Sequence, residues 1–153
     1  MLTQLEADIL LALEKLIRNA RGIKFPNYPG REDYELVSID QKEKFILTVS
    51  RNGKIRRDKC SYSKRYRNVI ILLRLDNDGR PHINPDGEEI PCPHLHIYRE
   101  GYYDAWAFPV PESFRDTDDL VGTLLDLLRY SNVINIDDVQ VIQGGLFDDY
   151  DGE

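Results

Sequence analysis

The segment 94–98, His-Leu-His-Ile-Tyr, alternates polar and apolar residues with a period of two. As a β-strand it places His94, His96 and Tyr98 on one face and its two aliphatic residues on the other. Upstream, the unbroken apolar run 69–73 is typical of a central strand that is buried on both faces. These two strands constrain the fold more than any other feature. They predict a sheet with one face that carries chemical groups.

Arg74 and Asp76 follow the apolar run two residues apart, so they share one side of their strand. The connection to the next strand contains Asn-Pro-Asp-Gly at 84–87, the residue order of a type I turn. Such a turn is expected to hold His82 and Asp86 close to the strand histidines. All three histidines of the chain then meet in an open pocket beside the basic segment described below.

The same stretch resembles a known family. The motifs PHxNPDG at 81–87, HLHIYREGY at 94–102 and WA at 106–107 are similar to those of an uncharacterised family of small bacterial and prophage proteins, a domain of unknown function. The likeness extends from the first predicted helix to the Gly-Gly-Leu-Phe sequence at 144–147. The resemblance implies a bacterial or mobile-element setting, and it implies no activity.

The order of the predicted elements indicates an α+β fold. A capping-box pattern at Thr3 and Glu6 begins an amphipathic helix over 3–20, and Asp116 or Thr117 caps a second helix that ends near 131. Strands are expected at 44–51, 54–61, 68–76, 94–98, 104–110 and 138–143. We therefore predict one domain over residues 1–153, with a mainly antiparallel twisted sheet of about five or six strands, both helices packed on it, and an acidic tail from about 148.

The net charge of -7 hides a strong segregation of charge. Eight basic residues against one acid give residues 51–67 a net charge of +7, and eleven acids against two arginines give 112–153 a net charge of -9. Aromatic residues alternate with cations in the basic segment, as in proteins that stack bases and bind phosphates, although a solvated basic loop has the same composition. The candidate nucleic-acid-binding residues are Arg56, Arg57, Lys59, Tyr62, Lys64, Arg65, Tyr66 and Arg67.

Three hypotheses account for the histidines. In the first, they perform metal-free acid/base catalysis on RNA, since histidine titrates near neutral pH; the candidate catalytic residues are His82, His94, His96, Arg74, Tyr98 and Asp86. In the second, a divalent metal is bound by the three imidazoles together with Glu100. In the third, the histidines only hold the loop through hydrogen bonds to Asp76, Asp86 and the backbone.

The function predicted from these features is that of a small bacterial mobile-element or toxin-antitoxin-like protein acting on RNA, with endoribonuclease as the candidate activity. A non-catalytic inhibitor or regulator, which binds a nucleic-acid enzyme through its acidic C-terminal third, is the alternative. No apolar run approaches the about 20 residues that span a bilayer, and the two cysteines show no metal-binding spacing. We therefore expect a cytoplasmic protein with RNA or a protein as partner, no membrane association and no cofactor.

Overall fold

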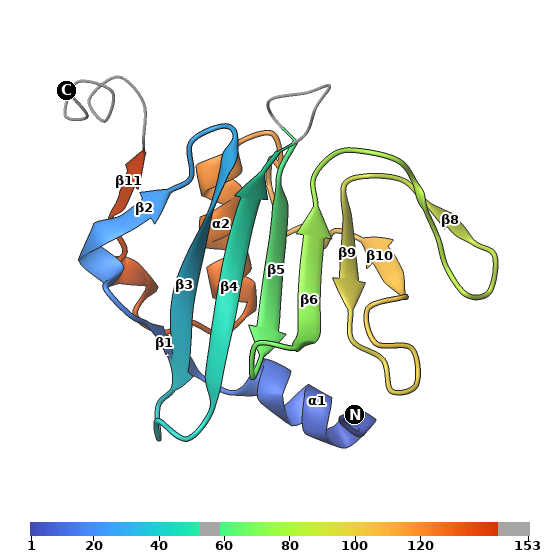
Figure 1. The fold of residues 1–153 in the computed structure, drawn as a ribbon, viewed down its shortest axis with the longest axis horizontal. Coiled ribbons are helices and arrows are strands. Elements are labelled where there is room, and N and C mark those ends of the chain that lie inside the picture. Colours follow the sequence, from blue (N-terminus) through green and yellow to red (C-terminus); the bar gives the residue numbers. More distant parts are fainter. Residues whose placement is uncertain (53–58, 144–153) are drawn as a thin grey trace.

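A computed structural model describes residues 1–52 and 59–143 of the chain, and Figure 1 shows its α+β fold. The elements in chain order are α1 (Gln4–Ala12), β1 (Lys15–Ile17), η1 (Ala20–Gly22), β2 (Ile23–Phe25), β3 (Gly30–Ser38), β4 (Lys44–Arg51), β5 (Ser61–Tyr66), β6 (Ile70–Asp76), β7 (His82–Ile83), β8 (Glu89–Ile90), β9 (His94–Ile97), β10 (Ala107–Pro109), α2 (Leu120–Tyr130), η2 (Ile136–Asp138) and β11 (Val141–Gln143). The predicted fold class is confirmed.

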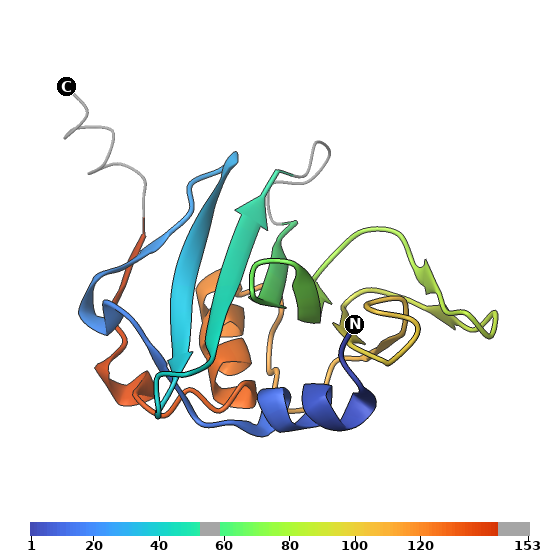
Figure 2. The same ribbon diagram turned by 60° about the horizontal axis from the view of Figure 1, so that its bottom comes forward.

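The main sheet has seven antiparallel strands in the order β1-β3-β4-β5-β6-β9-β10, rather than five or six. Helix α2 lies behind the strands in Figure 1, and in Figure 2 both helices lie below the sheet. We call the side of the sheet that the helices cover the inner face and the opposite side the outer face. The short hairpin of β7 and β8 projects beyond β9 at the end of the sheet (Figure 1).

Strand register assigns side chains to the two faces, because paired residues in adjacent strands point to the same side. One inner row runs across the sheet through Tyr34, Leu47, Lys64, Leu73 and Ile97. The neighbouring row on the outer face runs through Asp33, Thr48, Ser63, Arg74, His96 and Ala107. The side chain of Arg74 is thereby placed beside that of His96 on the face that lacks the helices.

Helix α1 begins as predicted and ends earlier than predicted. The side chains of Thr3 and Glu6 form the expected capping box, but the helix stops at Ala12 and the chain continues as β1. Pairing of β1 with β3 buries Lys15 and Ile17, which explains why the helical spacing of the later apolar residues misled the prediction of a helix over 3–20. The expected amphipathic character is also wrong in part, since the apolar residues Leu5 and Ile9 of this helix are exposed.

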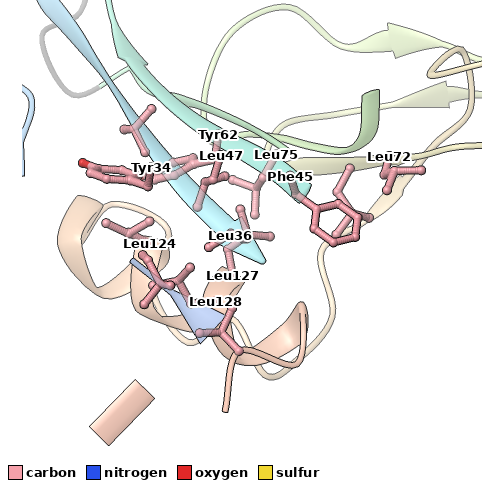
Figure 3. Packing of buried hydrophobic residues seen from close by; sticks show 14 of the residues in the cluster. Tyr34, Leu36, Phe45, Leu47, Tyr62, Leu72, Leu75, Leu124, Leu127 and Leu128 are labelled. Atoms are coloured by element: carbon pink, nitrogen blue, oxygen red, sulfur yellow. The ribbon is translucent and has the colours of Figure 1, made fainter. Parts of the chain in front are cut away.

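The inner face and α2 enclose the main core. In Figure 3 leucines of the helix face aliphatic and aromatic residues of the sheet. The labelled residues are Tyr34, Leu36, Phe45, Leu47, Tyr62, Leu72, Leu75, Leu124, Leu127 and Leu128. The predicted helix end near 131 is confirmed by the cap at Ser131, and the N-cap is Asp119 rather than Asp116 or Thr117.

The C-terminal strand is shorter than predicted. Residues 141–143 form β11, which pairs in parallel with β2 outside the main sheet. The predicted acidic tail from about 148 lies outside the described residues, and so does most of the predicted strand at 54–61. Within the described part of the chain, no helix has the length and apolar character needed to cross a membrane.

Candidate metal centre

The three imidazole rings meet on the outer face at the junction of β6 and β9. The register places Asp76 opposite His94 and Arg74 opposite His96, and β7 adds His82. The ring centroids of His82 and His96 lie 4.6 Å apart, those of His94 and His96 4.9 Å, and those of His82 and His94 6.0 Å. The proximity of the three rings that the sequence predicted is therefore present.

The cluster is not the open pocket that was expected. His94 and His96 are 3% and 1% exposed, because the β7–β8 hairpin and the segment before β10 cover them. The side chains of Asp76 and Arg74 retain 23% and 31% exposure. Solvent therefore reaches the cluster from the side of the carboxylate and the guanidinium, while the two strand imidazoles lie beneath.

Backbone carbonyls determine the tautomers of the two strand histidines. Nδ1 of His96 lies 2.8 Å from the carbonyl oxygen of Asp104, and Nδ1 of His94 lies 3.1 Å from that of Ile90. A carbonyl only accepts hydrogen bonds, so each Nδ1 carries the proton and donates it. The Nε2 atoms are therefore left as hydrogen-bond acceptors. Burial and the neighbouring His96 lower the pKa of His94, which keeps its ring neutral.

Both Nε2 atoms lie close to one carboxylate oxygen. Oδ2 of Asp76 lies 3.4 Å from Nε2 of His94 and 3.5 Å from Nε2 of His96, and the three atoms lie within 4.8 Å of one another. Ligand atoms at about 2.0–2.1 Å from a tetrahedral zinc ion are about 3.3–3.4 Å apart, so two edges of this triangle have nearly the required length. Ser61 donates a hydrogen bond to Oδ1 of Asp76 and thereby orients the carboxylate.

Arg74 supplies the positive charge next to these acceptors. Its Nε lies 3.3 Å from Oδ2 of Asp76, its Nη2 donates to Nε2 of His96 at 3.0 Å, and its Nη1 lies 2.8 Å from Oδ2 of Asp104. The donor role of the guanidinium agrees with an unprotonated Nε2 on His96. Burial raises the pKa of Asp76, but the charge of Arg74 and the hydrogen bond from Ser61 lower it, and this pKa lies below its usual value.

The loop between β6 and β9 is held by buried hydrogen bonds. The predicted turn is confirmed, since Gly87 N donates to the carbonyl oxygen of Asn84 at 2.8 Å. The Asn84 side chain donates to the carbonyl of Ala107 at 2.9 Å and accepts from its N–H at 2.8 Å. Nε2 of His82 donates to the carbonyl of Ala105 at 2.6 Å. Asp86 is exposed and accepts from Glu88 N within the turn, so it supports the turn rather than the cluster.

Two predicted site residues contact α1 instead. The buried hydroxyl of Tyr98 donates to the carbonyl of Leu2 at 2.6 Å, and Oε1 of Glu100 accepts from Gln4 N at 2.8 Å. The catalytic role of Tyr98 and the ligand role of Glu100 stay predictions, and the hydrogen bonds of both side chains join them to the N-terminal segment. The strand ends at Ile97, so its alternation does not continue to these residues.

A family model described as a family of unknown function, DUF6978, matches residues 2–133. The chain belongs to this family. The match ends short of the tail at 144–147, to which the likeness was expected to extend. It includes every residue of the histidine cluster in this DUF6978 chain. Neither a curated protein nor a solved structure matches the chain.

The described part of the basic segment in the DUF6978 chain is divided between the two faces of the sheet. Strand β5 is central in the sheet, and its alternation buries Tyr62, Lys64 and Tyr66 on the inner face. These three residues are not available to a nucleic acid. Lys59 and Arg67 are exposed, and Arg65 is half-buried and donates to Oγ1 of Thr48. Arg56 and Arg57 lie outside the described residues.

Sequence reasoning left several residues out of the candidate site. Asp76 was noted beside the histidines but was not proposed as a ligand or catalytic group, although its spacing from Arg74 on a buried strand was an available signal. Asp104, Asn84 and Ser61 were missed. They act through long-range hydrogen bonds, for which no local pattern exists in the DUF6978 sequence.

Proposed function

We propose that Asp76, His94 and His96 bind a divalent metal ion of the zinc class, and that this metal is the functional centre of the domain. The observation that carries the proposal is the convergence of two unprotonated Nε2 atoms on one carboxylate oxygen. Three acceptors that face each other repel unless a cation lies between them, and in the structure the guanidinium of Arg74 supplies that positive charge to Asp76 and His96. A mixed nitrogen and oxygen ligand set matches zinc and similar first-row ions.

Hydrogen bonds around the ligands support this proposal. Metal-binding histidines typically donate their second N–H to a backbone carbonyl or a carboxylate, which fixes the ring and its tautomer. His94 and His96 have that arrangement through the carbonyls of Ile90 and Asp104, and Ser61 orients Asp76.

The expected chemistry is metal-assisted hydrolysis. Three protein ligands leave coordination positions for water or substrate, and a bound zinc ion lowers the pKa of its water to about 7. RNA remains the proposed substrate, in the bacterial or mobile-element and cytoplasmic setting expected from the sequence. The metal-free mechanism is less well supported, because a general base must come within hydrogen-bond distance of its substrate and His94 and His96 are buried. The alternative function is that of a regulator which binds a nucleic-acid enzyme. It is supported only by the acidic composition of the C-terminal third.

Zinc titration calorimetry on chelator-treated protein tests the proposal. We expect one zinc ion per chain, and a loss of affinity of about 100-fold in Asp76→Asn and His96→Ala. Asp86→Asn is the matched control, because it makes the same change at an exposed acid in the nearby turn. Circular dichroism would establish that each variant is folded.

Zinc at about 100 times its dissociation constant should stabilise the wild type by about 2.7 kcal/mol in urea unfolding. The proposal fails if the folded wild type binds no zinc. It also fails if Asp86→Asn weakens zinc binding as much as Asp76→Asn does.

A further inference from the structure

Arg74 and a metal ion would compete for the same electron pair. Nε2 of His96 has one lone pair, and in the structure Nη2 of Arg74 donates to it at 3.0 Å. A metal bound by His96 must use that lone pair. It must also coordinate Oδ2 of Asp76, from which Nε of Arg74 lies 3.3 Å. Metal binding therefore removes the contact of the guanidinium with His96 and makes the guanidinium share the Asp76 oxygen with the metal ion.

The third partner remains. Nη1 of Arg74 lies 2.8 Å from Oδ2 of Asp104, whose side chain is not among the three proposed ligands. Arg74 is 31% exposed, so it can turn about this contact and present its freed N–H groups to solvent next to the metal. A guanidinium edge with two parallel donors is the typical partner of a phosphate or carboxylate group.

The charge of the site changes sign on metal binding. With the histidines neutral, Arg74 contributes +1 and Asp76 and Asp104 contribute -1 each, which sums to -1. A divalent ion raises the sum to +1. The site therefore repels an anion before the metal binds and attracts one afterwards.

We propose that the metal-loaded site binds a phosphate group between the metal ion and the freed guanidinium of Arg74. Without the metal ion, Arg74 contacts the proposed metal ligands. When the metal ion is bound, Arg74 binds the substrate instead. This inference rests on the proposed metal centre and names its substrate class, a phosphate ester. A phosphate is favoured over a carboxylate because it carries more negative charge and has oxygens for both the metal and the arginine.

Calorimetric titration with inorganic phosphate tests the inference, with acetate as the comparison anion. We expect phosphate to bind the zinc-loaded wild type at least about tenfold more tightly than the zinc-free protein, and more tightly than acetate. In Arg74→Met phosphate affinity should fall by at least about tenfold, while zinc affinity stays equal or increases because a competitor is removed. Arg74→Lys keeps the charge without the paired donors, so its phosphate affinity should lie between the two.

Arg31→Met is the matched control, since Arg31 lies on the same face of the sheet in β3 and pairs with Asp33. It should change neither zinc nor phosphate binding. The inference alone fails if zinc binds but phosphate affinity is the same with and without it, if acetate binds more tightly, or if Arg74→Met retains phosphate affinity. A loss of zinc affinity in folded Arg74→Met would also overturn it. Absence of zinc binding in the wild type would instead overturn the metal centre itself.

Discussion

Replacing the buried lysine of β5 should stabilise the protein. Lys64 lies on the inner face between Leu47 and Leu73, is fully buried, and its Nζ has no hydrogen-bond partner among the described residues. Phe45 is the aromatic neighbour, with its ring centroid 5.9 Å from Nζ. Burial lowers the pKa of Lys64 well below its usual value, and the nearby charge of Lys15 lowers it further.

The magnitude follows from the cost of removing the proton. A lowered pKa costs about 1.4 kcal/mol for each unit by which it falls below the unfolded-state pKa of about 10.4, so at pH 7 the cost is at most about 4 to 5 kcal/mol. Methionine has a similar length and no charge, and imperfect packing should cost about 1 to 2 kcal/mol. We therefore expect Lys64→Met to raise the free energy of unfolding, by up to about 4 kcal/mol.

The pH dependence provides a second measurement. A base whose pKa is lower in the folded protein binds fewer protons there than in the unfolded chain. Wild-type stability should therefore rise as the pH is raised toward about 10, the unfolded-state pKa of lysine, and fall as the pH is lowered. Lys64→Met should reduce this slope by up to about 1.4 kcal/mol per pH unit. The part of the slope that Lys15 contributes should remain, because burial lowers the pKa of Lys15 to about 8.

Urea unfolding followed by circular dichroism measures both effects. Lys44→Met is the control, because Lys44 is exposed on the adjacent strand β4, and its stability should stay within about 0.5 kcal/mol of wild type. The reasoning is refuted if folded Lys64→Met is less stable than wild type near neutral pH. An unchanged pH slope in that variant would refute it as well.

Three further substitutions test the hydrogen bonds that join distant parts of the chain. Lys15→Met should lower the free energy of unfolding in urea by about 2 to 3 kcal/mol, because Nζ donates to three backbone carbonyls near the ends of both helices; an unchanged value would contradict this. Tyr98→Phe should cost about 1 kcal/mol through the lost bond to Leu2 and leave zinc affinity unchanged in calorimetry. Asn84→Ala should lower the free energy of unfolding by about 1 to 3 kcal/mol, because it removes both hydrogen bonds to the backbone of Ala107. It should also weaken zinc binding about tenfold, because the loop over the cluster loosens. Retention of full zinc affinity would count against this positioning role.

Local patterns predicted the parts of the fold that depend on a few neighbouring residues. The capping box at Thr3, the turn at 84–87 and the strand at 44–51 all involve contacts within a short segment. The helix predicted over 3–20 was wrong after Ala12, because pairing with β3 outweighs helical periodicity there. Such pairing depends on residues about twenty positions away, which no local pattern reveals.

The sequence by itself determined that Arg74 and Asp76 share one face of their strand and that His94 and His96 share one face of theirs, because side-chain direction alternates in any β-strand. Only the tertiary structure decided that these two faces coincide, and that the alternation of β5 turns Lys64 toward the core. Register and the position of a strand in the sheet are set by contacts between segments far apart in the chain. For the same physical reason, the carbonyl of Asp104 that orients His96 emerged only from the folded arrangement.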